Sequence, residues 1–305
     1  MTEISESIDS MNLPNFLIIG AAKAGTTSLY YYLSQHPQIF MSSVKEPRFF
    51  ALEGEKLNFQ NPDNAINFTS VTSFTDYISL FESVTNEIAV GEASPLYMYS
   101  NKAIDRIHKY IPEVKLIAIL RNPIDRAYSS YKHLIALEKL TFAEALLEEE
   151  NRINNNWAHL WHYKNAGYYY KQLNPYFERF DKSKIKILLF EDLMSKPLEL
   201  LQEIFSFLEV DTTFVPDMNS QNVSVNPKYK ILDRILNGRN VIRSSTKMFI
   251  PERARKFLAN GVRGWNTKEF PPISSEARLH LIDEYREDIL NLQELLEIDL
   301  SSWLA

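Results

Sequence analysis

Short apolar runs alternate with helix-length segments along most of the chain. Continuous apolar runs at Phe16 to Ile19, Lys115 to Leu120 and Ile185 to Phe190 predict three buried strands. Because these runs are apolar at consecutive rather than alternate positions, we expect both faces of each strand to be covered. Such burial is typical of a parallel sheet with helices on either side. The pattern therefore predicts an α/β fold.

Each predicted strand is followed by a segment with helical features. The first helix is predicted over Thr26 to Gln35 and is stopped by Pro37. The second begins at Pro123, because proline is tolerated in the first turn of a helix. The third runs from about Pro197 to Leu208. The order strand, turn, helix is thus repeated three times.

Two further segments have helical patterns of their own. Residues 141–180 are predicted to be helical, with Thr141 as the N-cap and a solvent-exposed row of glutamates formed by Glu144, Glu148, Glu149 and Glu150. The segment from Ser274 to Glu297 has a serine cap and apolar residues at helical spacing. We expect it to be a terminal packing helix. Two aromatic-rich stretches, Tyr30 to Tyr32 and Trp157 to Tyr170, would belong either to the core or to a substrate cleft.

Composition limits the class of protein. With 45% hydrophobic and 24% charged residues among 305, the chain can bury a sizeable core, so global disorder is excluded. The absence of cysteine excludes disulfides, thiolate zinc sites and cysteine nucleophiles. No stretch is rich enough in Gly, Pro or Ser to divide the chain, so we predict a flexible tail over residues 1–13 and a single domain over residues 14–305.

The N-terminal segment bears on where the protein is located, and the net charge bears on whether it binds nucleic acid. The segment has no basic region and no apolar run near the roughly 18 residues that a membrane span needs. We therefore expect a cytoplasmic protein without a membrane span. The net charge of −6 argues against general nucleic-acid binding.

A strongly basic segment lies near the C-terminus. Residues 228–268 hold eleven basic and two acidic side chains, a charge of +9. We expect a helical, basic C-terminal lobe there. It would steer an anionic cofactor, dock an acidic partner such as an acyl carrier protein or an anionic sugar, or simply present a solvated basic face.

A glycine-bracketed loop follows the first predicted strand. The stretch GAAKAGTTS runs from Gly20 to Ser28, and we expect at least one of its hydroxyl residues, Thr26, Thr27 or Ser28, to cap the next helix. Backbone N–H groups of such a loop can approach an anion at the positive end of a helix. The outer glycines match a P-loop, but Thr26 stands where that motif needs lysine, and the only lysine, Lys23, lies inside the loop. A lysine there can sit over the bridging oxygen of a phosphate ester, so we favour an anion site over an ordinary capped turn.

A second stretch, RNPIDRAYSSY from Arg121 to Tyr131, follows the next long strand. Arg121 stands at the carboxyl end of the strand, and Ser129 lies about two turns into the helix that follows. A guanidinium with a hydroxyl can clamp a phosphate. Taken alone, Arg121 could instead form a structural ion pair with Asp125 or Glu92. Because ligands bind at this edge of a doubly wound sheet, two anion sites at two strand ends favour a bis-phosphorylated ligand.

Together these stretches resemble the two cofactor motifs of sulfotransferases that use 3′-phosphoadenosine 5′-phosphosulfate, in particular the bacterial and heparan-sulfate-type branch. The similarity continues, in order along the chain, through KEPRFF at 45–50, GEASPLY at 91–97, GYYYKQL at 167–173, FEDL at 190–193 and FPPISSEARLHL at 270–281. The resemblance implies a P-loop-like three-layer fold with a central parallel sheet flanked by helices.

The resemblance also implies the roles of individual residues. The 5′-phosphosulfate would be held by Lys23, Ala24, Gly25, Thr26, Thr27 and Ser28, and the 3′-phosphate by Arg121 and Ser129. A looser match adds Arg263, Gly264 and Lys268 as a cofactor-closing loop. The released product would be adenosine 3′,5′-bisphosphate. No metal is required where lysine and the helix dipole neutralise the leaving phosphate.

The catalytic base and the acceptor complete the implied activity. Glu46 matches the family's general base, with Lys23 as the second catalytic residue; His133 and His162 are rival bases, and pairing of Glu46 with Lys45 or Arg48 is the structural alternative. The acceptor would be a hydroxyl of a small molecule, a carbohydrate or a carrier-bound compound. Two other functions stay open: a P-loop-type kinase, with ILLFED at 187–192 as a Walker-B-like strand, and a non-catalytic nucleotide-binding module.

Overall fold

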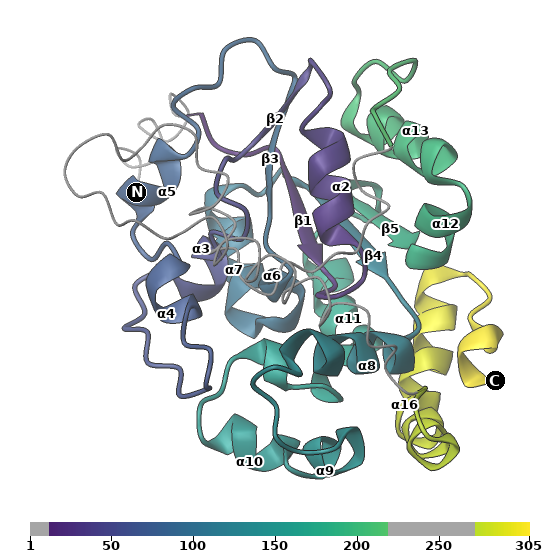
Figure 1. The fold of residues 1–305 in the computed structure, drawn as a ribbon. Coiled ribbons are helices and arrows are strands. Elements are labelled where there is room, and N and C mark those ends of the chain that lie inside the picture. Colours follow the sequence, from purple (N-terminus) through teal and green to yellow (C-terminus); the bar gives the residue numbers. More distant parts are fainter. Residues whose placement is uncertain (1–11, 219–271) are drawn as a thin grey trace, which may run out of the picture. The chain divides into compact units, whose positions relative to one another are not determined.

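Five parallel strands form the central sheet of this computed structural model, which describes residues 12–218 and 272–305 (Figure 1). The strands are β1 (Phe16–Gly20), β2 (Ile39–Met41), β3 (Ala89–Ala93), β4 (Lys115–Leu120) and β5 (Ile185–Leu189). They lie in the order β2-β3-β1-β4-β5. The three apolar runs of the sequence form β1, β4 and β5, which confirms those predictions, except that Phe190 begins the next helix instead of ending β5.

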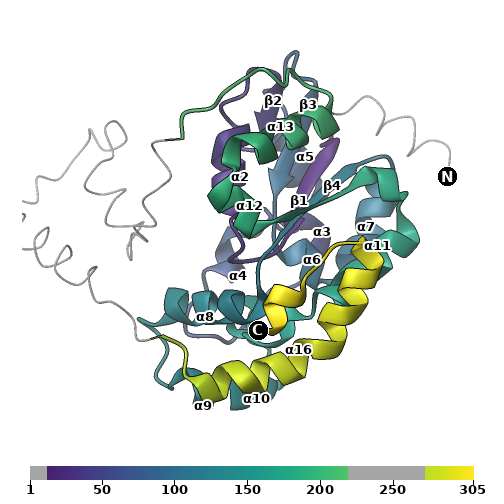
Figure 2. The ribbon, with the colours of Figure 1, turned by 90° about the vertical axis from the view of Figure 1, so that its right-hand side faces the viewer.

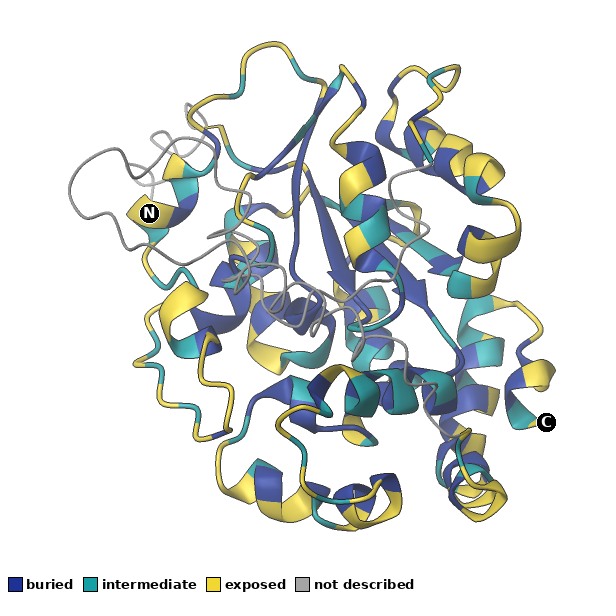
Figure 3. Ribbon diagram, viewed as in Figure 1, coloured by how far each residue is buried: buried dark blue, intermediate teal, exposed yellow. Residues whose placement is uncertain are grey.

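Helices cover both faces of the sheet. Figures 1 and 2 show α2 (Thr26–Leu33) and α13 (Pro197–Leu208) on one face, with α7 (Asn101–Tyr110) and α11 (Tyr169–Arg179) on the other. The strands β1, β3 and β4 are almost wholly buried, as their dark blue ribbons in Figure 3 show, and every residue of β1 is buried, whereas the edge strand β5 is partly exposed. The predicted three-layer α/β fold is therefore confirmed. The predicted basic lobe over residues 228–268, and most of the predicted tail over residues 1–13, lie outside the described residues.

The remaining elements connect these layers. The other α-helices are α3 (Phe49–Leu52), α4 (Ile66–Thr69), α5 (Phe74–Ser79), α6 (Leu96–Tyr99), α8 (Pro123–Leu134), α9 (Phe142–Leu147), α10 (Glu149–Asn154), α12 (Phe190–Ser195) and α16 (Ser275–Leu296). Short 3₁₀ turns are η1 (His159–Trp161), η2 (Asn165–Gly167), η3 (Lys182–Lys184) and η4 (Ser301–Leu304).

The segment 141–180 is only partly as predicted. Thr141 caps α9 in a capping box with Glu144, which confirms the predicted helix start. The chain then breaks into α9, α10, two 3₁₀ turns and α11, so the prediction of one helical segment is wrong. Glu149 is also not solvated, because its carboxylate is buried and accepts the N–H groups of Lys164 at 2.5 Å and Asn165 at 2.6 Å. These bonds satisfy the backbone N–H groups at the start of η2, which a continuous helix would not leave open.

The terminal helix α16 follows its prediction closely. The Ser274 hydroxyl accepts the Ala277 N–H at 3.2 Å and caps the helix. Further along, the buried Asp288 accepts the N–H groups of Tyr170 and Lys171 at the start of α11. A carboxylate from a distant part of the sequence thus caps α11, and so anchors α16 against that helix.

Candidate active site

Four strand ends bring the predicted site residues to one edge of the sheet. Lys23 comes three residues after β1, and Arg121 directly follows β4, the strand beside it. Glu46 lies beyond β2, and its N–H donates to the carbonyl of Ala93 at the end of β3, at 3.0 Å. Because the strands are parallel, their carboxyl ends share this edge, where ligands of doubly wound sheets bind.

The loop after β1 presents free backbone donors. Gly25 is the N-cap of α2 with a left-handed φ of 103°, and no side chain caps this helix end. The expectation that Thr26, Thr27 or Ser28 caps the helix is therefore wrong, because the glycine itself takes the cap position. An ideal Cβ on Gly25 would lie 2.8 Å from Leu193 and 3.2 Å from Phe190, so the loop is packed tightly against α12. Uncapped N–H groups at a helix N-terminus are the donor set that binds phosphate.

Lys23 lies inside this loop in an unfavourable setting for its charge. Burial lowers the pKa of its amine to about 8; nearby Lys45 and Arg121 add to the effect, and Glu46 opposes it. These effects on Lys23 place the three predicted residues Lys23, Arg121 and Glu46 in one electrostatic environment. An anion arriving here would restore the stability of the ammonium form.

Arg121 is held against the same loop. Its Nη1 donates to the carbonyl of Lys23 at 3.5 Å, and its guanidinium lies over the ring of Phe190, 4.6 Å from the centroid. The hydroxyl of Tyr169 donates to the Arg121 carbonyl at 2.9 Å and fixes the backbone. The arginine therefore stands beside the lysine loop with its charge still available to a ligand.

The structural ion pair considered for Arg121 is not formed. Asp125 pairs with Arg278 of α16 at 2.8 Å. Glu92 is fully buried and accepts the hydroxyl of Tyr97 instead. Both alternative carboxylates therefore have other partners. Ser129 lies on α8, partly buried, and its place beside the 3′-phosphate stays a prediction.

Glu46 is held as an ion between two cations. Lys45 Nζ lies 2.7 Å from one carboxylate oxygen and Arg48 Nη2 lies 2.7 Å from the other. Burial raises the pKa of Glu46, but the two cations outweigh it and lower the pKa to about 2. The pairing expected for a merely structural glutamate is therefore present, yet it occurs beyond the strand ends, where the charge of Glu46 acts on Lys23. A carboxylate here is always ready to accept a hydrogen bond.

Backbone strain also collects at this edge. Six non-glycine residues in the described part of the chain have a left-handed φ, and three of them are Lys23 (70°), Glu46 (62°) and Arg48 (60°). Such conformations cost on the order of 1–3 kcal/mol each and tend to cluster at functional sites. The site is therefore marked by conformation as well as by charge.

The rival histidines lie in different surroundings, and their role as bases stays a prediction. His162 is buried, its Nδ1 is 2.8 Å from the Tyr99 hydroxyl, and burial lowers its pKa to about 4. His133 lies on α8. A third histidine, His159, was not singled out, although the charge of Glu46 acts on it directly. Its segment, NNWAHLWHY, carries no motif that would have revealed this position.

The third predicted part of the cofactor site, Arg263, Gly264 and Lys268, lies outside the described residues. Within residues 12–218 and 272–305, no group of three acidic or histidine side chains is placed to hold a metal ion. No helix of that same part of the chain is long and apolar enough to cross a membrane.

A three-layer α/β fold with two cations at adjacent strand ends is typical of proteins that bind phosphorylated ligands. The sequence matches the Sulfotransferase family over residues 14–214. A sulfotransferase from Alicyclobacillus acidocaldarius, known from its crystal structure, is 31% identical with a TM-score of 0.75, over 96% of this chain and 99% of that one. The protein belongs to the sulfotransferase family.

Longer mammalian proteins are also similar. The mouse bifunctional heparan sulfate N-deacetylase/N-sulfotransferase 4 is 28% identical over 96% of this chain, which spans only 31% of the mouse protein. Mouse carbohydrate sulfotransferase 15 is 28% identical over 65% of this chain and 44% of its own length. The chain thus spans 31% of the length of the first of these relatives and 44% of the length of the second.

Proposed function

We propose that the protein transfers a sulfuryl group from 3′-phosphoadenosine 5′-phosphosulfate to a hydroxyl group of an acceptor. The observation that carries this proposal is the meeting of Lys23 and Arg121 at adjacent strand ends, with Arg121 Nη1 3.5 Å from the Lys23 carbonyl, beside an uncapped helix. Two cationic subsites in contact suit a ligand with two separate phosphate positions.

The residues present fit such a donor. The uncapped first turn of α2, from Gly25 to Ser28, and the side chain of Lys23 would hold the 5′-phosphosulfate. Arg121 and Ser129 would hold the 3′-phosphate. When bound, the donor supplies the sulfuryl group. The partly buried ammonium of Lys23 neutralises the charge that develops on the departing phosphate oxygen.

Glu46 accepts the proton from the acceptor. As the acceptor oxygen bonds to sulfur, the bond from sulfur to the bridging phosphate oxygen breaks, and the hydroxyl proton passes to a Glu46 oxygen. Lys45 and Arg48, each at 2.7 Å, hold that carboxylate in place. The products are a sulfate ester and adenosine 3′,5′-bisphosphate, and no electron donor or acceptor is needed.

The kinase alternative is tested by the choice of donor. We expect the purified chain to form a sulfate ester from the phosphosulfate donor in excess EDTA, because Lys23, Arg121 and the helix end supply the positive charge. Transfer from ATP that requires Mg²⁺, with no use of the sulfate donor, would refute the proposal. Binding of adenosine 3′,5′-bisphosphate without any transfer would support a non-catalytic module.

The names of the relatives favour one chemical class of acceptor. Heparan sulfate and carbohydrate appear in the names of the similar mouse proteins, so we favour a carbohydrate over a carrier-bound acceptor. One of those names specifies N-sulfation. An acceptor screen with isotopically labelled sulfate donor should therefore contain sugars with hydroxyl groups alone and sugars with a free amino group.

Replacing Arg121 with alanine should weaken binding of adenosine 3′,5′-bisphosphate by about tenfold or more, since a charge-assisted bond to phosphate is worth about 1.5–3 kcal/mol. Calorimetric titration measures this directly. The control is Arg278→Ala, which removes an arginine that pairs with Asp125 in place of a ligand. A loss of turnover with unchanged affinity would contradict the role of Arg121 in binding the 3′-phosphate.

A further inference from the structure

Buried polar atoms without hydrogen-bond partners gather around Glu46. The described residues contain seven such side-chain atoms, and three of them belong to residues that interact electrostatically with Glu46: Arg48 Nε, Glu92 Oε2 and His159 Nδ1. A fourth, Arg126 Nε, belongs to a residue whose charge acts on His159. Folded proteins satisfy nearly all buried polar groups, so a local concentration of exceptions needs a physical explanation. A ligand that supplies the missing partners is one.

His159 is the central member of this group. Its side chain is buried, with 6% of the residue exposed, and burial lowers its pKa to about 3, helped by Arg48 and opposed by Glu46. The charge of Arg126 also acts on it. The ring is therefore neutral at physiological pH and offers one donor and one acceptor nitrogen.

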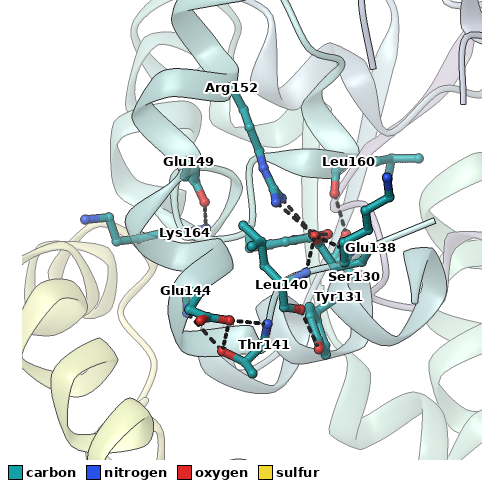
Figure 4. A network of polar contacts seen from close by, with 12 residues as sticks. Ser130, Tyr131, Glu138, Leu140, Thr141, Glu144, Glu149, Arg152, Leu160 and Lys164 are labelled. Atoms are coloured by element: carbon teal, nitrogen blue, oxygen red, sulfur yellow. Dashed lines mark hydrogen bonds and ion pairs between the residues drawn. The ribbon is translucent and has the colours of Figure 1, made fainter. Parts of the chain in front are cut away.

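The backbone on both sides of His159 is firmly anchored. The Ala158 N–H donates to Asn61 Oδ1 at 2.9 Å, and the Ser130 hydroxyl donates to the Leu160 carbonyl at 2.9 Å. Figure 4 shows the Ser130 to Leu160 bond within a wider polar network on α8 and α10. The residues flanking His159 therefore have their partners, while its own Nδ1 has none.

A buried ion pair supports the same segment. Arg152 lies 2.9 Å from Glu138, and the Tyr163 hydroxyl donates to the same glutamate at 2.9 Å (Figure 4 shows the Arg152 to Glu138 contact). The guanidinium also lies over the rings of Trp157 and Trp161. This network holds the chain from 157 to 163 rigidly, as a side chain that must position a substrate requires.

A histidine that serves only packing looks different in this protein. His36 is equally buried, with 2% exposed, but both of its ring nitrogens are used. Nε2 is 2.9 Å from the Asp211 carbonyl, and Nδ1 accepts the Gln38 N–H at 3.1 Å. Among the buried histidines of the described residues, unpaired ring nitrogens therefore occur at His159 (Nδ1) and at nearby His162 (Nε2), but not at His36.

We propose that His159 belongs to the acceptor site, where its imidazole hydrogen-bonds to the acceptor and positions the reacting hydroxyl beside Glu46. This inference rests on the proposed sulfuryl transfer. Since Arg48 and Arg126 offer further N–H groups and Glu92 a further oxygen, the site suits an acceptor with several oxygen atoms, such as a sugar. A simple alcohol or phenol would leave most of these atoms unpaired.

The test compares His159→Phe with His36→Phe. At saturating donor, we expect His159→Phe to raise the KM of sugar acceptors by about tenfold or more, the loss of one hydrogen bond in a desolvated site. Its affinity for adenosine 3′,5′-bisphosphate should stay within about twofold of the parent, because the donor is held elsewhere. His36→Phe should lower thermal stability and leave the sugar KM unchanged. His159→Gln, which keeps a polar group, should lie between parent and His159→Phe.

Two outcomes would overturn the inference while leaving the proposed function intact. One is an unchanged sugar KM in both His159 variants that bind adenosine 3′,5′-bisphosphate normally. The other is a parent enzyme that sulfates phenols and simple alcohols but no sugar of the screen. A parent that binds no adenosine 3′,5′-bisphosphate would instead refute the proposed function itself. In the parent, the NMR shifts of the His159 ring should change on adding the sugar, while those of His36 do not.

Discussion

Replacement of Lys23 with alanine is expected to lower kcat by about 10²-fold or more, the typical loss when one preorganised donor to a transition-state charge is removed. The reason is the position of this side chain, which lies partly buried inside the loop between β1 and α2, where the charges of Arg121 and Glu46 act on it. A buried ammonium interacts more strongly with developing charge than an exposed one. Single-turnover measurement of sulfuryl transfer separates this loss from weaker donor binding.

The pH dependence of the parent provides a second check on Lys23. Because the pKa of its amine is about 8 in the free protein, the charged form is lost as pH rises through that value. The kcat/KM for the donor should therefore fall above about pH 8, and Lys23→Arg should shift that fall to higher pH because a guanidinium stays protonated. Lys102→Ala, which removes an exposed lysine paired with Glu55, is the control. A Lys23→Ala variant with kcat within threefold of the parent would remove Lys23 from the mechanism.

Local sequence pattern revealed only part of the sheet. The strands β1, β4 and β5 are continuous apolar runs, whereas β2 has three residues and β3 is AVGEA, with a glycine and a glutamate at its centre. In the fold, the ring of Phe16 occupies the space where a Cβ of Gly91 would be, 2.4 Å from its ideal position. Glu92 is buried against Tyr97. Contacts with distant segments thus determine that β3 forms a strand, and its own sequence has no hydrophobic period that would predict one.

The candidate active site could likewise be predicted only in part from the sequence. Lys23 and Arg121 could be predicted because a charged residue after a buried strand must emerge at the sheet edge. The cap of α2 could not, since glycine in a left-handed conformation replaced the expected hydroxyl. His159 could not either, because the break after α10 and the bond from Ser130 place it, and both depend on packing between helices.

Replacement of Glu46 with glutamine is expected to lower kcat by about 10²–10⁴-fold, the usual contribution of a positioned general base. The amide has nearly the same shape but cannot take a proton. Binding of adenosine 3′,5′-bisphosphate should change little, because Lys23, Arg121 and the end of α2 hold that ligand in the proposed arrangement. Initial rates at saturating donor and acceptor, together with calorimetric titration of the product nucleotide, measure the two quantities separately.

A matched control exists for the loss of ion pairs in this variant. Glu55 also bridges two cations, Lys102 at 2.7 Å and Arg106 at 3.0 Å, so Glu55→Gln should leave kcat near that of the parent.

The pH profile of kcat distinguishes Glu46 from Glu92 as the base, because burial raises the pKa of Glu92 to about 7. A base with the pKa of Glu46, about 2, keeps kcat level from about pH 7 down to pH 5, whereas Glu92 as base would make kcat fall over that range. Full activity in Glu46→Gln, or loss of activity in His162→Phe with retained binding of the nucleotide, would assign the proton transfer to another residue.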